Sequence, residues 1–187
     1  MKRPSLWGIL VFTIALATAA SPAMANRLGV EAGGLFPFSS LNDRINVSPY
    51  FGATFDIQEI NPLGQMALLG VYLHAAYSPL TVDKETKDAL VQLGNSDTSA
   101  SYFEGTIGLK AHAKTSPIFL TVQTGYAHYD APGGGSKGGI AGGVGVGTAF
   151  GGPALHLTIE GRMNVAFLSE IDDLQFFTLT ASLGFPF

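Results

Sequence analysis

The 187-residue sequence contains no cysteine, and only 13% of its residues are charged. Without cysteine the chain can form no disulfide, no thiolate metal site and no cysteine-linked lipid anchor. Basic residues are also scarce, with 10 against 14 acidic ones, and this balance argues against nucleic acid as a partner. After residue 25 no apolar run approaches the roughly 20 residues that a membrane-spanning helix needs.

The first 25 residues have the order of a cleavable secretory signal. Two basic residues come first, an apolar segment follows at 6–17, and Ala-Met-Ala at 23–25 has the small-residue pattern of a cleavage site. An uncleaved anchor helix is the alternative, but the apolar segment is shorter than a membrane span. We therefore predict a cleaved signal peptide at 1–25 and one mature domain at 26–187, with eight basic and 14 acidic residues.

Alternating apolar residues in the mature chain predict β-strands, because successive side chains leave a strand on opposite faces. In the last strand the apolar positions are Phe177, Leu179, Ala181, Leu183, Phe185 and Phe187. The same alternation defines eight segments, at 28–36, 47–57, 67–77, 103–112, 118–127, 140–150, 155–167 and 177–187. Their lengths suit tilted strands that cross a bilayer, which need roughly 9–11 residues each.

The connections between these segments alternate in length. Short turns at 61–64, 114–117 and 151–153 alternate with longer, more polar connections at 38–46, 79–99, 131–138 and 168–173. Short turns on one side and long loops on the other are typical of outer-membrane barrels, with both termini on the short-turn side. The sequence therefore predicts an all-β fold, an eight-stranded antiparallel up-and-down transmembrane β-barrel.

The two faces of the predicted strands differ in polarity. One carries Leu, Val, Ile and Phe, whereas the other carries small and hydroxyl residues with a few charges. The apolar face suits lipid, and small polar residues suit the crowded interior of an eight-stranded barrel. The alternative is a secreted soluble β-barrel that binds an apolar ligand, in which the apolar face would point inward.

The signal peptide, the eight strands and the last-strand pattern together resemble the small outer-membrane β-barrel superfamily of OmpA- and OmpX-type domains. The resemblance covers the mature chain and is specific in its last strand. It implies a Gram-negative outer membrane, with membrane lipid and lipopolysaccharide as surroundings. It also implies that Leu179, Leu183, Phe185 and Phe187 form the signal recognised by the outer-membrane assembly machinery.

Charged residues on the inner face predict a polar network in the lumen. We expect it to comprise Glu31, Asp56, Tyr72, Glu104, Lys110, His156, Glu160 and Arg162. The acids are expected to pair with the basic residues, with tyrosines including Tyr50 and with inward histidines, because an unpaired buried charge is costly. The network is interpreted as a polar plug that holds the barrel closed. A narrow gated ion path is the alternative.

Two other patterns, the inward histidines and a glycine motif, are weaker candidates for a binding site. His74, His112 and His156 share the inner face but lie at different heights, so no metal site and no cofactor is predicted. The glycines at 133–138 match a dinucleotide fingerprint, yet a strand follows them where that motif requires a helix, so they are interpreted as a surface loop.

A short capped helix is predicted at 83–94, inside the longest loop. We expect Leu90, Val91 and Leu93 to be buried against the barrel rim. The helix is also a candidate contact site for an extracellular partner.

These observations favour a non-enzymatic barrel that supports the envelope or interacts through its four long loops. A small gated channel and a lipid-modifying enzyme are the alternatives. The enzyme would have to use His128, which lies on the apolar face near the rim.

Overall fold

A computed structural model describes residues 26–38, 44–60, 67–113, 116–151, 155–169 and 173–187. Its elements are β1 (Arg27–Phe38), β2 (Ile45–Asn46), β3 (Ser48–Ile60), β4 (Ala67–Val82), α2 (Lys84–Gln92), β5 (Ala100–Ala113), β6 (Ile118–Asp130), β7 (Ser136–Gly151), β8 (His156–Leu168) and β9 (Leu174–Pro186). The predicted signal peptide, the turn at 61–64 and parts of the other two short turns lie outside the described residues.

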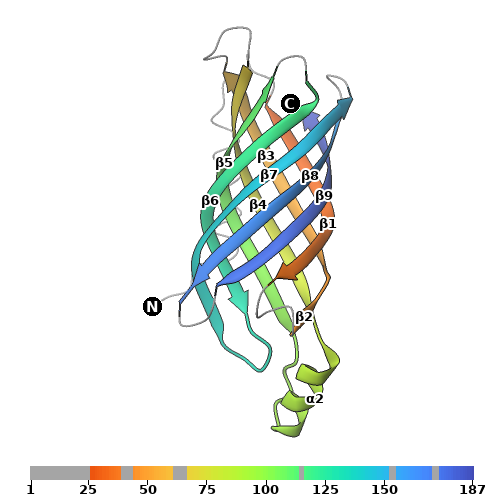
Figure 1. Cartoon of the computed structure of the whole chain (residues 1–187), viewed down its shortest axis with the longest axis vertical. Coiled ribbons are helices and arrows are strands. Elements are labelled where there is room, and N and C mark those ends of the chain that lie inside the picture. The colour runs from red at the N-terminus through yellow and green to blue at the C-terminus, as the bar shows by residue number, and fades with distance from the viewer. Residues whose placement is uncertain (1–25, 39–43, 61–66, 114–115, 152–154, 170–172) are drawn as a thin grey trace.

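Eight of the strands form a closed antiparallel barrel, which confirms the predicted fold (Figure 1). Each pairs with its neighbours in chain order, and β1 closes the ring by pairing with β9 from Arg27↔Pro186 to Phe38↔Gln175. The remaining pairings of the ring are β1–β3, β3–β4, β4–β5, β5–β6, β6–β7, β7–β8 and β8–β9. A closed sheet satisfies its backbone hydrogen bonds without leaving an exposed edge.

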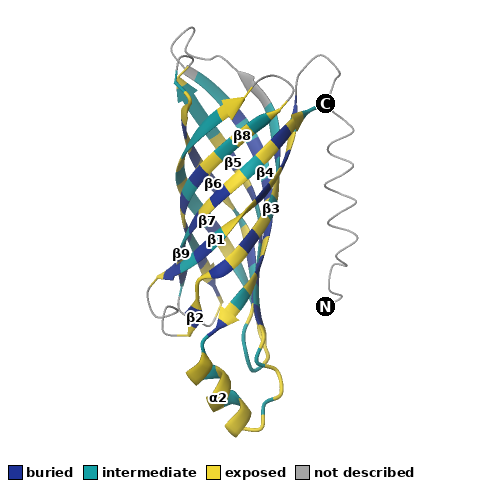
Figure 2. Ribbon diagram, turned by 90° about the vertical axis from the view of Figure 1, so that its right-hand side faces the viewer, coloured by how far each residue is buried: buried dark blue, intermediate teal, exposed yellow. Residues whose placement is uncertain are grey.

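The apolar faces of the strands point away from the barrel axis. Along one strand buried and exposed residues alternate, as Figure 2 shows. The exposed apolar residues include Val30, Ile107, Leu120, Val144 and Leu179. This orientation is the reverse of a soluble barrel with an apolar core, so the alternative of a secreted soluble barrel does not fit the structure.

The two ends of the barrel differ. The first and last described residues, Asn26 and Phe187, lie together at one end, where the Phe187 amide donates a 3.1 Å hydrogen bond to the Asn26 carbonyl. We call this the terminus end. The helix α2 and the short strand β2 lie at the opposite end, which we call the α2 end (Figure 1).

The inner face is apolar at the α2 end, which the sequence did not lead us to expect. An apolar plug forms there from Leu35, Ile45, Val82, Tyr102, Leu168, Leu174 and Phe176, all buried to 6% exposure or less. The β2 residue Ile45 pairs with Val82 of β4, and its side chain is buried in this cluster. The rings of Tyr102 and Phe176 meet edge to face at 4.9 Å. Because their strands lie on opposite sides of the ring, this contact spans the lumen.

The predicted helix is confirmed as α2, with Asp83 as its N-cap. The predicted burial is wrong for Val91 and Leu93, which are 62% and 83% exposed, whereas Leu90 is half-buried. The helix projects beyond the barrel end and does not lie on its rim (Figure 2), so no barrel surface is there to cover these side chains. Among the described residues, no helix is both long and apolar enough to cross a membrane.

The N-cap of α2 makes a first prediction. The Thr86 hydroxyl and amide donate hydrogen bonds to the Asp83 carboxylate, and these bonds hold the pKa of Asp83 below its ordinary value. Asp83→Ala should therefore increase hydrogen exchange of the α2 amides and leave that of the barrel strands unchanged. The exposed Asp88→Ala is the control and should leave α2 protected.

The same cap should depend on pH. Because the folded pKa of Asp83 is lowered, the cap contributes above the ordinary aspartate pKa of about 4 and is lost as pH falls through the lowered value. Exchange of the α2 amides in the wild type should approach that of Asp83→Ala only under such acid conditions. Equal α2 protection in wild type and Asp83→Ala at neutral pH would contradict the assignment.

Candidate functional site in the barrel lumen

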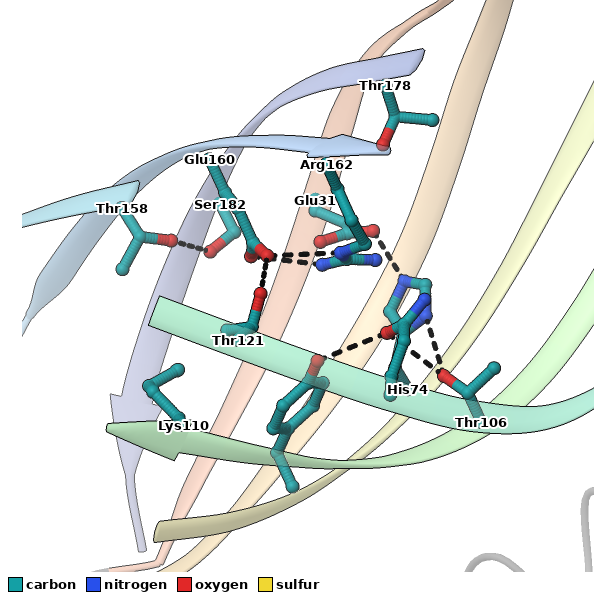
Figure 3. Close-up of polar contacts among 12 residues, drawn as sticks. Glu31, His74, Thr106, Lys110, Thr121, Thr158, Glu160, Arg162, Thr178 and Ser182 are labelled. Atoms are coloured by element: carbon teal, nitrogen blue, oxygen red, sulfur yellow. Dashed lines mark hydrogen bonds and ion pairs between the residues drawn. The ribbon is translucent and has the colours of Figure 1, made fainter. Parts of the chain in front are cut away.

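The eight residues of the predicted lumen network lie on the inner wall. Glu31, Tyr72, Glu104, Glu160 and Arg162 are buried, whereas Asp56, Lys110 and His156 are half-buried toward the terminus end. Seven of them fall into three groups by their partners, which Figure 3 shows in part, and the eighth, His156, lies on the wall near the terminus end.

The first group is an ion pair within β8. Arg162 donates from Nε to Glu160 Oε1 at 3.0 Å and from Nη2 to Glu160 Oε2 at 2.9 Å. The two residues are two apart, so the strand places both side chains on the same face. Thr121 of β6 donates its hydroxyl to Glu160 as well. This paired, hydrogen-bonded geometry is what allows an arginine with 1% exposure to remain buried.

The second group surrounds His74 of β4. Its Nε2 lies 2.7 Å from Glu31 Oε1, and its Nδ1 lies 3.5 Å from Glu104 Oε1. Tyr50 and Tyr102 donate their hydroxyls to the two oxygens of Glu104, at 2.6 and 2.8 Å. Both carboxylates are thereby held by fully buried partners, which joins β1, β3, β4 and β5 across the lumen.

The third group lies nearer the terminus end. Lys110 Nζ is 3.0 Å from Asp56 Oδ1, and the two side chains keep 20% and 28% of their exposure. The ammonium also lies over the rings of Tyr72 and Phe119, at 5.7 and 5.2 Å from their centroids. Cation–π contact and an ion pair together fix the lysine against the wall.

Two neutral amides, Gln123 and Asn164, extend this network, and our sequence analysis missed them. Thr106 joins Gln123 to the His74 group, since its hydroxyl donates to Gln123 Oε1 at 3.2 Å and lies 3.4 Å from His74 Nδ1. Tyr72 donates to Gln123 at 3.1 Å, Gln123 donates to Asn164 at 3.4 Å, and Asn164 donates to Thr178 at 3.2 Å. Their positions on the inner face follow from strand alternation, which could have identified them. The prediction took the ionisable side chains of the inner face, and amides are not ionisable.

The glycines of β7 make room for the ion pair. A Cβ on Gly145 would lie 2.5 Å from Glu160 Oε1 and 2.5 Å from Thr121 Oγ1, and one on Gly143 would lie 2.6 Å from Asn164 Oδ1. Contacts under about 3 Å are not tolerated without displacement. The glycine-rich composition of β7 is therefore matched to the large side chains of β8 and β6 that face it.

The structure gives little support to a lipid-modifying enzyme or to a metal site. On the outer face Ser101 donates to Asp130 at 3.1 Å, and His128 Nε2 lies 3.2 Å from the same carboxylate. A nucleophilic serine needs its hydroxyl on the imidazole, whereas here the carboxylate stands between them. In the described part of the chain, no three His, Asp or Glu side chains are grouped to hold a metal ion.

Comparison with known proteins gives the class of the fold. No protein-family model and no curated protein matches the sequence. Among solved structures, the chain is similar to Neisserial surface protein A, NspA, with 14% identity over 87% of this chain and 97% of that one, at a TM-score of 0.53. It is also similar to Ail, the attachment invasion locus protein of Yersinia pestis, with 16% identity, 87% and 97% coverage and a TM-score of 0.52.

These likenesses confirm the predicted architecture. The chain has the fold of the small eight-stranded outer-membrane β-barrels. At such low identity they show the fold and leave the function to the residues of this chain.

The fit of Gly145 makes a second prediction. Gly145→Ala should lower the free energy of unfolding by about 1–3 kcal/mol, because the added methyl group displaces Glu160 or Thr121. The control is Gly142→Ala on the same strand, where an added Cβ would lie 3.5 Å from the Gln123 carbonyl oxygen, an ordinary van der Waals contact. Urea unfolding in lipid vesicles measures both. Equal stability of the two variants would contradict the packing argument.

The ion pair makes a third prediction. Arg162→Met leaves the buried Glu160 carboxylate unpaired and should cost about 3–5 kcal/mol in the same unfolding measurement. The double variant with Glu160→Leu removes both charges and should lose less than the single variant. A single variant within about 1 kcal/mol of wild type would show that the pair contributes nothing to holding the barrel.

Proposed function

We propose that the chain is a non-enzymatic integral outer-membrane barrel whose filled lumen supports its structure and whose loops interact with an external partner. The observation that carries this proposal is the combination of an outward apolar surface with a lumen crossed by ion pairs and closed by the apolar plug. An outward apolar surface is stable only against lipid. A lumen filled in this way leaves no open pore.

The outer surface has the layered composition of a membrane barrel. Aliphatic side chains occupy the middle, and exposed aromatic side chains lie toward both strand ends: Tyr77, Tyr126 and Phe167 near the α2 end, and Phe150, Phe185 and Phe187 near the terminus end. Two aromatic girdles mark the two interfaces of a bilayer. By the same rule the terminus end faces the periplasm and the α2 end faces outward.

The loops at the α2 end support the interaction role, because two of them are joined. Asn95 donates its side-chain amide to the Gly133 carbonyl, and the Gly133 amide donates to the Asp97 carbonyl, both at 2.8 Å. Gly133, Gly134 and Gly135 all have positive φ, which side chains other than glycine rarely adopt. The predicted loop 79–99 is thus fixed against the predicted loop 131–138.

A groove of about 610 Å³ lies between these loops and the strand ends, with Tyr77, Asp97, Ser99, Ser101 and Asp130 among its lining. Its carboxylates, hydroxyls and aromatic ring give a partner several places to bind. NspA is described as a surface protein and Ail as an attachment invasion protein, which is consistent with a surface role for this fold. The loops at 38–46 and 168–173 are described only in part.

The localisation makes a fourth prediction. The protein should fractionate with outer membranes, migrate faster on an unboiled gel than after boiling, and show no stable conductance in planar bilayers. Arg162→Met, as a destabilised control, should lose its gel shift at a lower temperature. Recovery of the wild type in the soluble periplasmic fraction would contradict the membrane assignment, and a stable conductance would contradict the filled lumen.

The assembly signal makes a fifth prediction. Phe187 and Phe55 pack at 5.7 Å on the outer face, so Phe187→Ser has a structural effect as well as any loss of recognition. We expect Phe187→Ser to lower the folded fraction in cells far more than Phe55→Ser does, whereas in lipid vesicles, where no assembly machinery is present, both variants should refold with a similar loss of stability. Phe55→Ser is the matched control and should lose stability without a specific defect in cells. If the folded fraction in cells is the same for the two variants, the proposed assembly signal of Leu179, Leu183, Phe185 and Phe187 is contradicted.

A further inference from the structure

The groove of about 610 Å³ at the α2 end lies over a row of residues that crosses neighbouring strands. The row has one residue from each strand, paired in register: Pro79 of β4, Ser101 of β5, Asp130 of β6 and Ser136 of β7. The residues beside the row along the strands, such as Tyr102, are buried inside the barrel, so the row lies on the outer face. Because neighbouring strands lie about 4.8 Å apart, the row is about 14 Å wide, which matches about four residues of extended chain.

Fixed walls border this row on two sides. Toward the middle of the barrel stands Tyr77, which lies on the same face of β4 as Pro79 and is 47% exposed. Toward the loops, the wall is made by Asp97 and the glycines at 134–135. The Gly133 amide donates to the Asp97 carbonyl at 2.8 Å, which holds the two loops together. A groove with fixed walls binds a ligand without first having to be ordered.

The groove is acidic. Its carboxylates are Asp97 and Asp130, and none of the described residues that line it is lysine, arginine or histidine. The Ser99 hydroxyl and amide donate to Asp97 Oδ1 at 2.6 and 3.0 Å and hold the pKa of Asp97 below its ordinary value, so this carboxylate is ionised at neutral pH. Asp130 already contacts Ser101 and His128. The hydrogen bonds described for Asp97 both end on Oδ1, which leaves Oδ2 to accept from a ligand.

The wall favours an organic cation over a metal ion. In the described part of the chain no three His, Asp or Glu side chains are grouped to hold a metal, and a hard cation needs several oxygen ligands. The exposed ring of Tyr77 attracts an organic cation through its π face. Leu80 and Ala131 give the groove an apolar part that suits the aliphatic stem of an arginine or a lysine. Of these two, only the planar guanidinium of arginine both stacks on a ring and donates two parallel hydrogen bonds to one carboxylate.

We propose that this groove binds an arginine-bearing basic segment of an external polypeptide, with Asp97 pairing with the guanidinium and Tyr77 stacking on it. The width of the row accommodates a short extended segment, and the charge of the wall selects a basic one. This inference names the partner class for the interaction role in the proposed function, and it rests on that function only for the side of the membrane that the groove faces.

The test uses the protein in nanodiscs of zwitterionic lipid, whose surface does not attract a basic peptide. Fluorescence anisotropy measures the binding of short labelled peptides of equal length that carry arginines, lysines or glutamates among glycine and serine. We expect the arginine peptide to bind about threefold tighter or more than the lysine peptide, and the glutamate peptide not to bind. Affinity for the arginine peptide should fall as salt is added, because the paired charges are exposed to solvent.

Two variants locate the site. Asp97→Asn keeps an oxygen for Ser99 but removes the charge, and Tyr77→Ala removes the ring. Each should weaken binding of the arginine peptide about threefold to fivefold. The matched control is Asp88→Asn, which removes an exposed carboxylate of α2 outside the groove and should bind like wild type. Each variant is first checked for the unboiled-gel shift, which shows that the barrel has folded.

The inference is overturned if the arginine peptide does not bind, or if the glutamate peptide binds equally well. Wild-type affinity in both Asp97→Asn and Tyr77→Ala would place the site elsewhere. Equal binding of the arginine and lysine peptides would contradict the guanidinium assignment. If spermidine, a polyamine without a peptide backbone, binds as tightly as the arginine peptide, the ligand is a small amine and the polypeptide partner is wrong.

The proposed function is tested apart from this inference, with Val91→Cys on the exposed α2 of the otherwise cysteine-free chain. On intact cells an impermeant thiol reagent should label this cysteine. If it is protected while the nanodisc result stands, the orientation in the proposed function is wrong and the ligand class of the groove is retained. If it is labelled while the arginine peptide does not bind, the α2 end faces outward and the inferred partner is wrong.

Discussion

In a closed ring of eight strands the interior is so narrow that an inward side chain reaches those of strands two positions away around the ring. The contacts of this lumen follow that rule: Glu31 of β1 meets His74 of β4, Asp56 of β3 meets Lys110 of β5, and Thr121 of β6 meets Glu160 of β8. Each such pair constrains the relative height of three strands at once. A shift of one strand by a residue would turn its polar side chains into lipid, so the network and the strand register depend on each other.

Because a buried charge is costly unless it is well paired, the sizes of the side chains in this lumen matter for stability as much as their polarity. An arginine in a dry interior is stabilised only when its partner is held in good geometry, and Thr121 and Arg162 together hold Glu160 from two strands. That geometry needs space, which Gly145 on β7 provides. The glycine at position 145 of β7 is therefore matched to the ion pair on β8.

Strand alternation predicted the strands, and the different polarity of their two faces predicted which face looks inward, because both properties can be read along the chain itself. It could not predict which inward residues meet, since His74 and Glu104 become neighbours only through the pairing of strands. It missed the apolar plug for a different reason. The outward apolar pattern stops where lipid stops, but the hydrogen-bonded ladder continues to Pro79↔Ser101 and Leu80↔Ala100. Tyr102 and Phe176 lie at or beyond the predicted strand ends, where inward residues are no longer marked by apolar neighbours outside.

This extension of the strands beyond the lipid-facing surface links the plug to the loops. Once outward side chains no longer contact lipid, the strand ends need another source of stability, and apolar residues packed inside the mouth supply it. The same packed mouth holds β2, whose Ile45 pairs with Val82 just before the cap of α2. A barrel with polar residues throughout its interior would leave these ends hydrated and mobile. The plug therefore does two things with one set of side chains: it closes the lumen, and it gives the joined loops a rigid base from which Val91 and Leu93 project.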